Sequence, residues 1–482
     1  METTELWRLS AGQLRTAYAA KDTTPREVTE ATLAHIAERD GELGAIVTVD
    51  AEGARRDAAI ATETWRSGNP PPLCGVPLTV KDLIFTKGLR TAGGSRRFAD
   101  FVPDVDAAVV ERVRAAGAVV LGKSATCELG HKFTGDSELF GLCRNPWDTS
   151  RTTGGSSGGA GAALAAGFGP LALATDALGS IRVPSAFCGV FGIKPTYGVV
   201  PRAPGFAPPS WDSLAHTGPM ARTVADAALL LAQIAGSDSR DRMSIDAPVR
   251  FTYDAKMFEA IAGEPGRALA GLRVGFSPDL GYAAVDVEVA ALVARAVGAF
   301  GECGARIEFA DPGFSDPLDE VLYPIGMSEL RASRASDSAQ ERALLDSTLR
   351  DAIAATPEWT AVDYVRAGYG RNAIWRAMNT FFETNDVLVT PTVAIPAFVV
   401  GEIGVDTVAG RSVQKHLGWS PFTFPFNLCG LPAASLPCGL TASGLPVGLQ
   451  LVGPRFAEGL ILRAAAAFEA VRPWPLFAPP SR

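Results

Sequence analysis

The sequence predicts an α/β fold, because short β-branched runs alternate with helical patterns along much of the chain. Two neighbouring pairs of segments carry this prediction. An amphipathic pattern at 25–40 precedes the run GVPLTVKD at 75–82, and a helical pattern at 107–116 is followed directly by AVVLGKS at 118–124. Such alternation is typical of sheets that have helices packed on them.

The first of these pairs gives the clearest local signals. Val28, Leu33 and Ile36 recur near helical spacing in PREVTEATLAHIAERD, and Thr24 stands where a helix cap is expected. The run GVPLTVKD is short and bounded by Gly and Pro, which predicts a buried strand. That strand would end with Lys81.

A stretch rich in Gly, Ser and Ala follows at 154–175. Its composition predicts a loop that leads into a closely packed helix and then into the strand LALAT at 171–175. The next turn holds Ser180.

From about 240 to 385 helical patterns dominate, with LRVGF and ARIEF as strand candidates, and we expect a more variable helical lobe there. The remaining segments return to strands before an Ala-rich helix at 458–471. The expected strands are DVLVTPT at 386–392, LPAASLPCG at 431–439 and VGLQLVG at 447–453.

Composition excludes several classes of protein. Of the 482 residues, 47% are hydrophobic and 20% charged, which is typical of a folded globular protein. The formal net charge of -8 provides no overall positive field for nucleic acid or an anionic membrane, so neither partner is expected. The N-terminal residues lack the pattern of a secretory signal, and no apolar run resembles a membrane span, which together predict a cytoplasmic protein.

Three segments together could supply the groups that attack an amide. Such chemistry needs a nucleophile, a base and donors for the developing oxyanion. The run GGSSGG at 154–159 places two serines on a Gly-rich turn, and the turn at 176–182 could direct successive N–H groups at an anion beside Ser180. Lys81, at the end of an apolar strand, would have a pKa lowered by desolvation.

These segments resemble the amidase signature enzymes. The likeness lies in GGSSGG, in TDALGSIRVPSAFCGVFGIKPTYG at 175–198, in GVPLTVKD and in the 24-residue interval from Ser156 to Ser180. It continues in LFGLCRNPWD at 139–148, GPMART at 218–223 and GLPVGLQLVG at 444–453, and so spans nearly the whole chain. The resemblance implies a single domain over 1–482, with a central mixed sheet flanked by helices on both faces.

The resemblance also implies a Ser-Ser-Lys triad. Neutral Lys81 would take a proton from Ser156, while Ser156 takes one from the nucleophile Ser180, and Ser156 would follow a non-proline cis peptide bond. Neither a metal nor an organic cofactor is implied. The backbone N–H groups of the oxyanion hole would be those of Ala177, Leu178, Gly179 and Ser180.

One position departs from the family pattern. Relatives usually have two glycines before the nucleophile, and here the first of them is Leu178. A leucine would be strained if the position required a positive φ angle. Because Lys81, Ser156, Ser180 and Arg182 are all present, we expect an altered pocket shape and retained activity.

Three residues are expected to support the site. Ser157 could hydrogen-bond within the site or cap the following helix, and the sequence favours neither alternative. Asp176 is expected to accept hydrogen bonds that brace the oxyanion turn. Arg182 is expected to pair with an acid.

The substrate-binding residues are less well specified. His131 could line the pocket or lie at the surface, and no histidine has the spacing of a metal site. Four aromatic residues are candidates for an apolar wall, although a role in the core is the commoner one for such side chains. If they line the pocket, an apolar or aromatic amide fits best. The four are Phe133, Trp211, Trp419 and Phe422.

The resulting functional hypothesis is a hydrolase that cleaves the C–N bond of a small amide through an acyl-enzyme on Ser180. One alternative is the amidase subunit of a tRNA-dependent amidotransferase. Another is a catalytically silent binding protein that lost its chemistry at Leu178. The family resemblance also favours a homodimer, and the motif chemistry does not choose among amides, anilides and carbamates.

Overall fold

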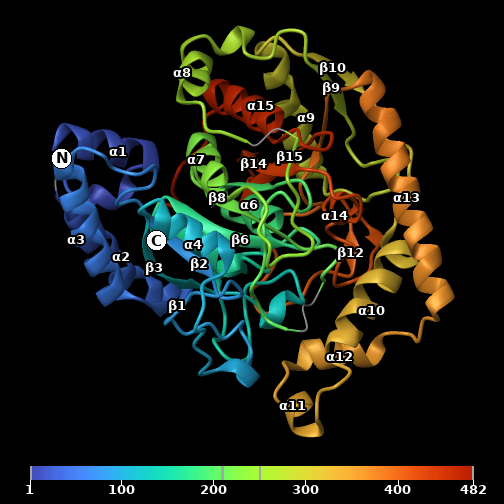
Figure 1. The fold of residues 1–482 in the computed structure, drawn as a ribbon. Helices are drawn as coiled ribbons and strands as arrows, with labels where there is room; N and C mark the ends of the chain where they lie inside the picture. Colours follow the sequence, from blue (N-terminus) through green and yellow to red (C-terminus); the bar gives the residue numbers. More distant parts are fainter. Residues whose placement is uncertain (1–2, 208–210, 249–250, 480–482) are drawn as a thin grey trace.

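A mixed sheet of eleven strands runs through the centre of the computed structural model, which describes residues 3–207, 211–248 and 251–479 (Figure 1). In spatial order the strands are β1 (Ile46–Val49), β3 (Val119–Ser124), β2 (Pro77–Lys81), β6 (Leu171–Asp176), β8 (His216–Ala221), β7 (Phe191–Lys194), β14 (Ala433–Leu440), β15 (Pro446–Val452), β11 (Val387–Pro391), β9 (Arg273–Phe276) and β10 (Arg306–Phe309).

Parallel and antiparallel pairs both occur in this sheet. Strand β2 pairs in parallel with β3 and β6, and β9 pairs in parallel with β10 and β11. The strands between these two groups pair antiparallel. The expected mixed central sheet of an α/β protein is confirmed.

Helices cover both faces of the sheet, and alternate side chains of a strand show how. Val120 of β3 belongs to a core that includes residues of α4 (Ala108–Ala115), α7 (Val224–Ile234), α9 (Val287–Glu302) and α15 (Glu458–Val471). Its neighbours Val119 and Leu121 point the other way, against α2 (Pro25–Leu43), α3 (Ala51–Ser67) and α5 (Gly158–Ala166). Successive strand side chains face opposite sides of a sheet, so both faces are buried.

The predicted N-terminal helix is present as α2 and begins where the sequence indicates. Thr24 caps it, since its hydroxyl accepts a hydrogen bond from the Glu27 N–H while the Glu27 carboxylate accepts one from the Thr24 N–H. The helix ends at Leu43, three residues beyond the pattern, where Gly44 adopts a left-handed conformation.

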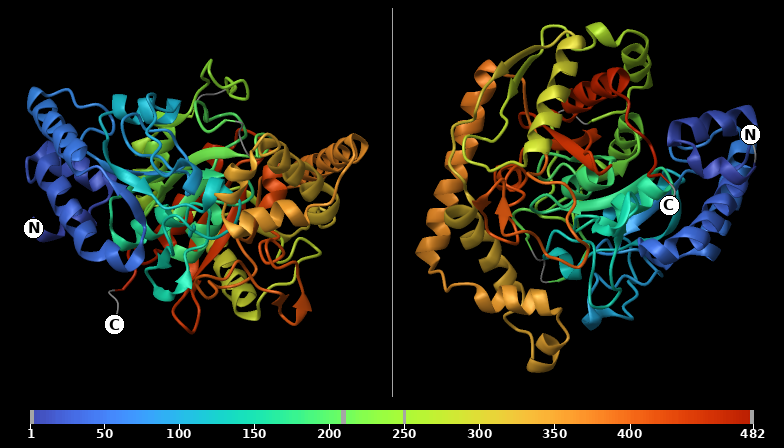
Figure 2. Two further views of the ribbon diagram at one scale, coloured as in Figure 1. Left: turned by 90° about the horizontal axis from the view of Figure 1, so that it is seen from below. Right: turned by 180° about the vertical axis from the view of Figure 1, so that it is seen from behind.

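The region expected to form a helical lobe, at about 240–385, has two parts. Its strand candidates are β9 and β10, which extend the central sheet, and α8 (Ala255–Gly263) and α9 pack with α15. The later helices lie on the side of the molecule opposite α1 (Ala11–Ala20), α2 and α3 (Figures 1 and 2). They are α10 (Tyr323–Ser333), α11 (Ala339–Ala343), α12 (Ser347–Ala355) and α13 (Ala361–Thr384).

The C-terminal elements follow the predicted order. Strands β11, β14 and β15 correspond to the three expected strands, and α15 spans the expected 458–471. The described fold also contains short elements, among them α6 (Arg182–Cys188), α14 (Phe424–Leu428), and the small ribbons formed by β4 (Arg144–Asn145) with β5 (Asp148–Thr152) and by β12 (Thr407–Val408) with β13 (Arg411–Ser412). No helix in the described ranges has the length and apolar character of a membrane span.

The sheet topology brings the three candidate segments together. Strands β2 and β6 are parallel neighbours, so Lys81 and Asp176, at their carboxyl ends, lie at the same edge of the sheet. The turn after β6 leads through Ser180 into α6, and Ser156 and Ser157 immediately precede α5, which packs against α6.

Candidate active site

Lys81 is fully buried and is surrounded by hydroxyl groups. Its Nζ lies 2.8 Å from Ser156 Oγ, 2.8 Å from Ser157 Oγ and 2.9 Å from Thr175 Oγ1. Burial lowers the pKa of Lys81 to about 7, although the negative charge of Asp176 opposes this shift. No carboxylate in the described parts of the chain forms an ion pair with Lys81. About half of the Lys81 amine is therefore neutral near pH 7.

The hydrogen bonds are consistent with that neutral amine. Ser157 donates its own proton to the carbonyl oxygen of Thr175 at 3.0 Å, so its hydroxyl can only accept from Lys81. A neutral amine has two N–H donors and one lone pair, so one of its three partners must donate to it. Ser156 or Thr175 can fill that role.

The Ser157 side chain lies against Lys81. Ser157 occupies the cap position of α5, but its side chain makes no capping hydrogen bond there. Its hydroxyl instead contacts Lys81, and its N–H donates to the Ser180 carbonyl at 3.2 Å. Of the two alternatives that the sequence left open, the structure supports the contact within the site.

Ser156 and Ser180 lie in two segments that are connected by the hydrogen bond from the Ser157 N–H to the Ser180 carbonyl. Both serines are buried, at 2% and 4% exposed. The peptide bond between Gly155 and Ser156 is cis, as the family resemblance implies. The structure thus places Lys81 in hydrogen-bond contact with Ser156, and the Ser180 backbone in contact with the residue that follows Ser156.

The turn at 177–180 leaves its amide groups available. Among the described residues, no acceptor receives a hydrogen bond from the N–H of Ala177, Leu178, Gly179 or Ser180. Gly179 has a φ of 147°, which favours glycine, and a Cβ there would lie 2.6 Å from Thr423 Oγ1. A series of unpaired N–H groups in a tight turn is suited to an anion.

Leu178 adopts an ordinary backbone conformation. Six described residues other than glycine have a positive φ, and Leu178 is not one of them. A leucine is therefore accommodated at this position without left-handed strain. What it changes is the local surface, because its side chain is 5% exposed and lines a cavity.

Asp176 and Arg182 form a fully buried ion pair beneath the turn. Arg182 Nε lies 3.0 Å from Asp176 Oδ2, and Arg182 Nη2 lies 3.0 Å from Asp176 Oδ1. Burial alone would raise the pKa of Asp176, but the Arg182 charge and its hydrogen bonds hold that pKa well below the usual range. Asp176 also accepts from the Ile181 N–H at 3.1 Å, which closes the turn around Ser180.

Replacing Asp176 by asparagine is expected to destabilise the protein by about 3–5 kcal/mol, because a buried Arg182 would lose its counter-charge. Urea unfolding followed by circular dichroism would measure the change. Glu30→Gln is the matched control, since Glu30 pairs with Arg55 at 2.7 Å with both side chains about half exposed. We expect that control to change stability by less than about 1 kcal/mol. Equal effects of the two substitutions would contradict the bracing role of Asp176.

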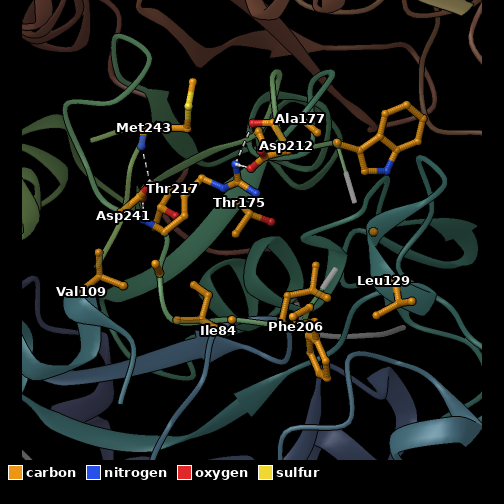
Figure 3. Close-up of a pocket in the computed structure, with 18 of the residues that line it drawn as sticks. Ile84, Val109, Leu129, Thr175, Ala177, Phe206, Asp212, Thr217, Asp241 and Met243 are labelled. Carbon is orange, nitrogen blue, oxygen red and sulfur yellow. Dashed lines mark hydrogen bonds and ion pairs between the residues drawn. The ribbon is translucent and has the colours of Figure 1, made fainter. Parts of the chain in front are cut away.

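A first cavity, of about 420 Å³, opens beside Ser156. Apolar Ile84, Leu129 and Phe206 line one side, and Asp212 and Asp241 lie toward the other (Figure 3). The remaining lining residues are Leu83, Val109, Gly130, Thr175, Ala177, Arg202, Ala203, Gly205, Ala207, Trp211, Ala215, Thr217, Arg240, Arg242 and Met243.

A second cavity, of about 440 Å³, begins at Leu178 and is bounded by α10, α12 and the loop before α14. Its lining is more apolar than that of the first. It is formed by His131, Lys132, Leu178, Trp211, Asp319, Tyr323, Met327, Leu330, Ala352, Ala355, Thr356, Pro357, Trp359, Gln414, His416 and Leu417.

His131 lines the second cavity in its neutral form. Burial lowers the pKa of His131 to about 3. Its Nδ1 lies 2.8 Å from the carbonyl oxygen of Glu128, and its Nε2 lies 2.9 Å from Thr348 Oγ1. With both nitrogens engaged, His131 contributes a fixed wall.

Three of the four candidate wall aromatics belong to the core. Phe133, Trp419 and Phe422 are at most 3% exposed and line neither cavity. The Phe133 and Trp419 rings pack edge to face at 5.7 Å, in a cluster that also contains Phe187. Their assignment to the pocket wall is corrected accordingly, whereas Trp211 lines both cavities.

The amidase family model matches residues 27–462. The chain belongs to the amidase signature family. An acylamidase of Rhodococcus erythropolis is 38% identical over 468 residues, covering 97% of this chain and 96% of the relative. A glutamyl-tRNA(Gln) amidotransferase subunit of Moorella thermoacetica is also 38% identical, over 494 residues, 96% of this chain and 97% of that protein.

Solved structures of amidase signature enzymes agree with this fold. A bacterial aryl acylamidase of the family superposes with a TM-score of 0.86 at 30% identity, covering 97% of this chain and 96% of the other. The 6-aminohexanoate cyclic dimer hydrolase superposes with a TM-score of 0.84 at 30% identity, covering 97% and 98%. The protein is therefore an amidase-family hydrolase that acts on C–N bonds.

Several residues of this amidase's site could not be recognised from the sequence. Thr175 is the third hydroxyl around Lys81, and only the parallel pairing of β2 with β6 brings it there. Asn427 and Gln450 complete the hydrogen bonds of Arg182 from more than 240 residues away. No local pattern marks residues at such a separation, although the place of Thr175 directly before Asp176 was a usable signal.

Proposed function

We propose that this amidase hydrolyses small amides with an apolar or aromatic substituent, through an acyl-enzyme on Ser180. The observation that carries the proposal is the buried Lys81 amine in contact with Ser156, next to a turn with unpaired N–H groups that contains Ser180. These are a base, a relay and donors for an oxyanion. The acylamidase relative and the apolar second cavity support an apolar or aromatic substrate.

The proposed reaction begins with proton transfer through the two serines. Neutral Lys81 takes the Ser156 proton as Ser156 takes the Ser180 proton, and Ser180 Oγ attacks the amide carbonyl carbon. The N–H groups of the turn at 177–180 bind the oxyanion. Ser156 then donates a proton to the amide nitrogen, Lys81 returns its proton to Ser156, and the C–N bond breaks. Water, deprotonated by the same relay, hydrolyses the ester on Ser180 and releases the acid.

The rate is expected to rise with pH through about 7. Below that pH Lys81 is protonated and cannot accept a proton, and above it the neutral amine predominates. Measuring kcat/KM from about pH 5 to pH 9 would show the inflection. Circular dichroism across the range would establish that the protein stays folded. A flat profile in folded protein would contradict Lys81 as the base.

The glutamine-hydrolysing part of a glutamyl-tRNA(Gln) amidotransferase is a second candidate function, supported by relatives as similar as the acylamidase. Such a protein would release ammonia from glutamine and would act with partner proteins. The third hypothesis, a silent binding protein, loses its main argument because Leu178 is not strained.

One panel distinguishes these functions. Amine and ammonia release would be measured from primary amides, anilides, carbamates and glutamine, with Ser180→Ala protein as the blank. Release from anilides or primary amides by the purified chain is the expected result. Activity on glutamine alone, with co-purification of a partner, would favour the amidotransferase function, and no release from any compound would contradict the proposed hydrolase.

A further inference from the structure

The two cavities meet at the turn that precedes Ser180. Ala177 lines the first cavity and Leu178, the next residue, lines the second. Trp211 lines both. A carbonyl bound by the N–H groups of this turn would therefore have one cavity on each side, and the two substituents of an amide extend to opposite sides of its carbonyl.

Ser156 fixes which substituent enters which cavity. In the proposed mechanism Ser156 donates the proton to the leaving nitrogen, so the nitrogen must face Ser156. Ser156 lines the first cavity and is absent from the lining of the second. The amine side of the substrate thus belongs in the first cavity, and the acyl side is left with the second.

The character of the two linings agrees with this direction. Five charged residues line the first cavity, among them Arg202 and Asp212, and two line the second, Lys132 and Asp319. The more charged first cavity suits an amine that leaves toward water. The second is walled by Leu178, Met327 and Leu330, and its volume of about 440 Å³ lies within the range of small-ligand sites. An aromatic or medium-chain acyl group matches that lining.

Trp211 is held in place as the wall between the cavities. It is 5% exposed and has a φ of 57°, which is uncommon for a large residue. Its ring packs on Gly326 of α10 so closely that a Cβ there would lie 2.4 Å from Trp211 Cζ3. The indole N–H is buried and meets no acceptor among the described residues.

We propose that the second cavity is the acyl pocket of this enzyme, that the first receives the leaving amine, and that Trp211 separates the two and so sets the acyl groups accepted. This inference rests on the proposed function and goes further, because it assigns a direction to the substrate. It names aromatic and medium-chain carboxylic amides as the substrate class.

The same substitution in each cavity tests the assignment. Met327→Trp would fill the second cavity, and Met243→Trp would fill the first. Purified native and variant enzymes would be assayed on two series: acetyl, butyryl, hexanoyl and benzoyl amides of p-nitroaniline, and acetyl amides of ammonia, aniline and naphthylamine. The quantities compared are ratios of kcat/KM within each series, which do not depend on the fraction of active protein.

We expect Met327→Trp to lower the hexanoyl-to-acetyl and benzoyl-to-acetyl ratios at least about tenfold, with the amine ratios changed less than about threefold. Met243→Trp should instead lower the aniline-to-ammonia and naphthylamine-to-ammonia ratios at least about tenfold and change the acyl ratios less than about threefold. Met327→Ala enlarges the same pocket and should raise the hexanoyl-to-acetyl ratio. It tests the assignment if the tryptophan variant does not fold. The assignment would be overturned if Met327→Trp changed the amine series and Met243→Trp the acyl series, or if neither folded variant changed any ratio. Native enzyme that releases no amine from either series would instead contradict the proposed function.

Discussion

Ser180→Ala is expected to lower kcat/KM for any amide substrate at least about 10,000-fold, because no other described group takes the place of the attacking oxygen. The substitution removes one buried oxygen atom, and the Ser180 carbonyl would still accept from the Ser157 N–H. The fold should therefore survive, as unfolding curves would show. Steady-state assays with the best substrate of the panel would measure the loss.

Ser150→Ala provides the matched control for that experiment. Ser150 is exposed, and its hydroxyl donates to Asp148 at 2.7 Å, away from both cavities. The control should keep full activity and should react with a serine-directed phosphonate as the native enzyme does. A Ser180→Ala protein that retains more than about a hundredth of native activity would rule out Ser180 as the nucleophile.

Lys81→Met is expected to lower kcat about 100- to 10,000-fold, the range of a lost general base. Methionine has a similar length and can fill the buried space, so the protein should stay folded. The pH dependence near 7 should disappear together with the activity, because Lys81 is the group that titrates there in the proposed mechanism. Stopped assays at several pH values would test both effects at once.

Lys87→Met is the control for the lysine substitution. Lys87 is exposed, lies six residues further along the chain and lines neither cavity. We expect its activity and pH profile to match those of the native enzyme. If Lys81→Met kept native activity in folded protein, the base would have to be another group.

The sequence predicted those parts of the fold that depend on local patterns. The end of β2 at Lys81 and the cap of α2 at Thr24 follow from apolar periodicity and from residues that have a specific backbone role. The addition of β9 and β10 to the central sheet was not predictable in the same way. Strand β9 pairs with β11, which lies about 110 residues further along the chain, and β10 joins the sheet only through β9; such long-range pairing leaves no signature within a short run.

In the candidate site too, local motifs were predictable and contacts between distant segments were not. The motifs around Lys81, Ser156 and Ser180 identified the segments that meet, but the contact of Thr175 with Lys81 depends on strand register. Trp419 and Trp211 illustrate a second limit. Both are aromatic, nearly buried and part of the same apolar cluster, yet only Trp211 also lines the cavities, and the surrounding chain decides this difference.

The most direct test of covalent catalysis is a search for the acyl-enzyme by mass spectrometry. The native amidase would be mixed with a p-nitroanilide, quenched in acid during turnover, and digested for peptide analysis. We expect an adduct with the mass of the acyl group on Ser180, absent from Ser180→Ala protein treated identically. Turnover with the adduct on another residue, or with no adduct under conditions where p-nitroaniline is released in a burst, would contradict covalent catalysis by Ser180.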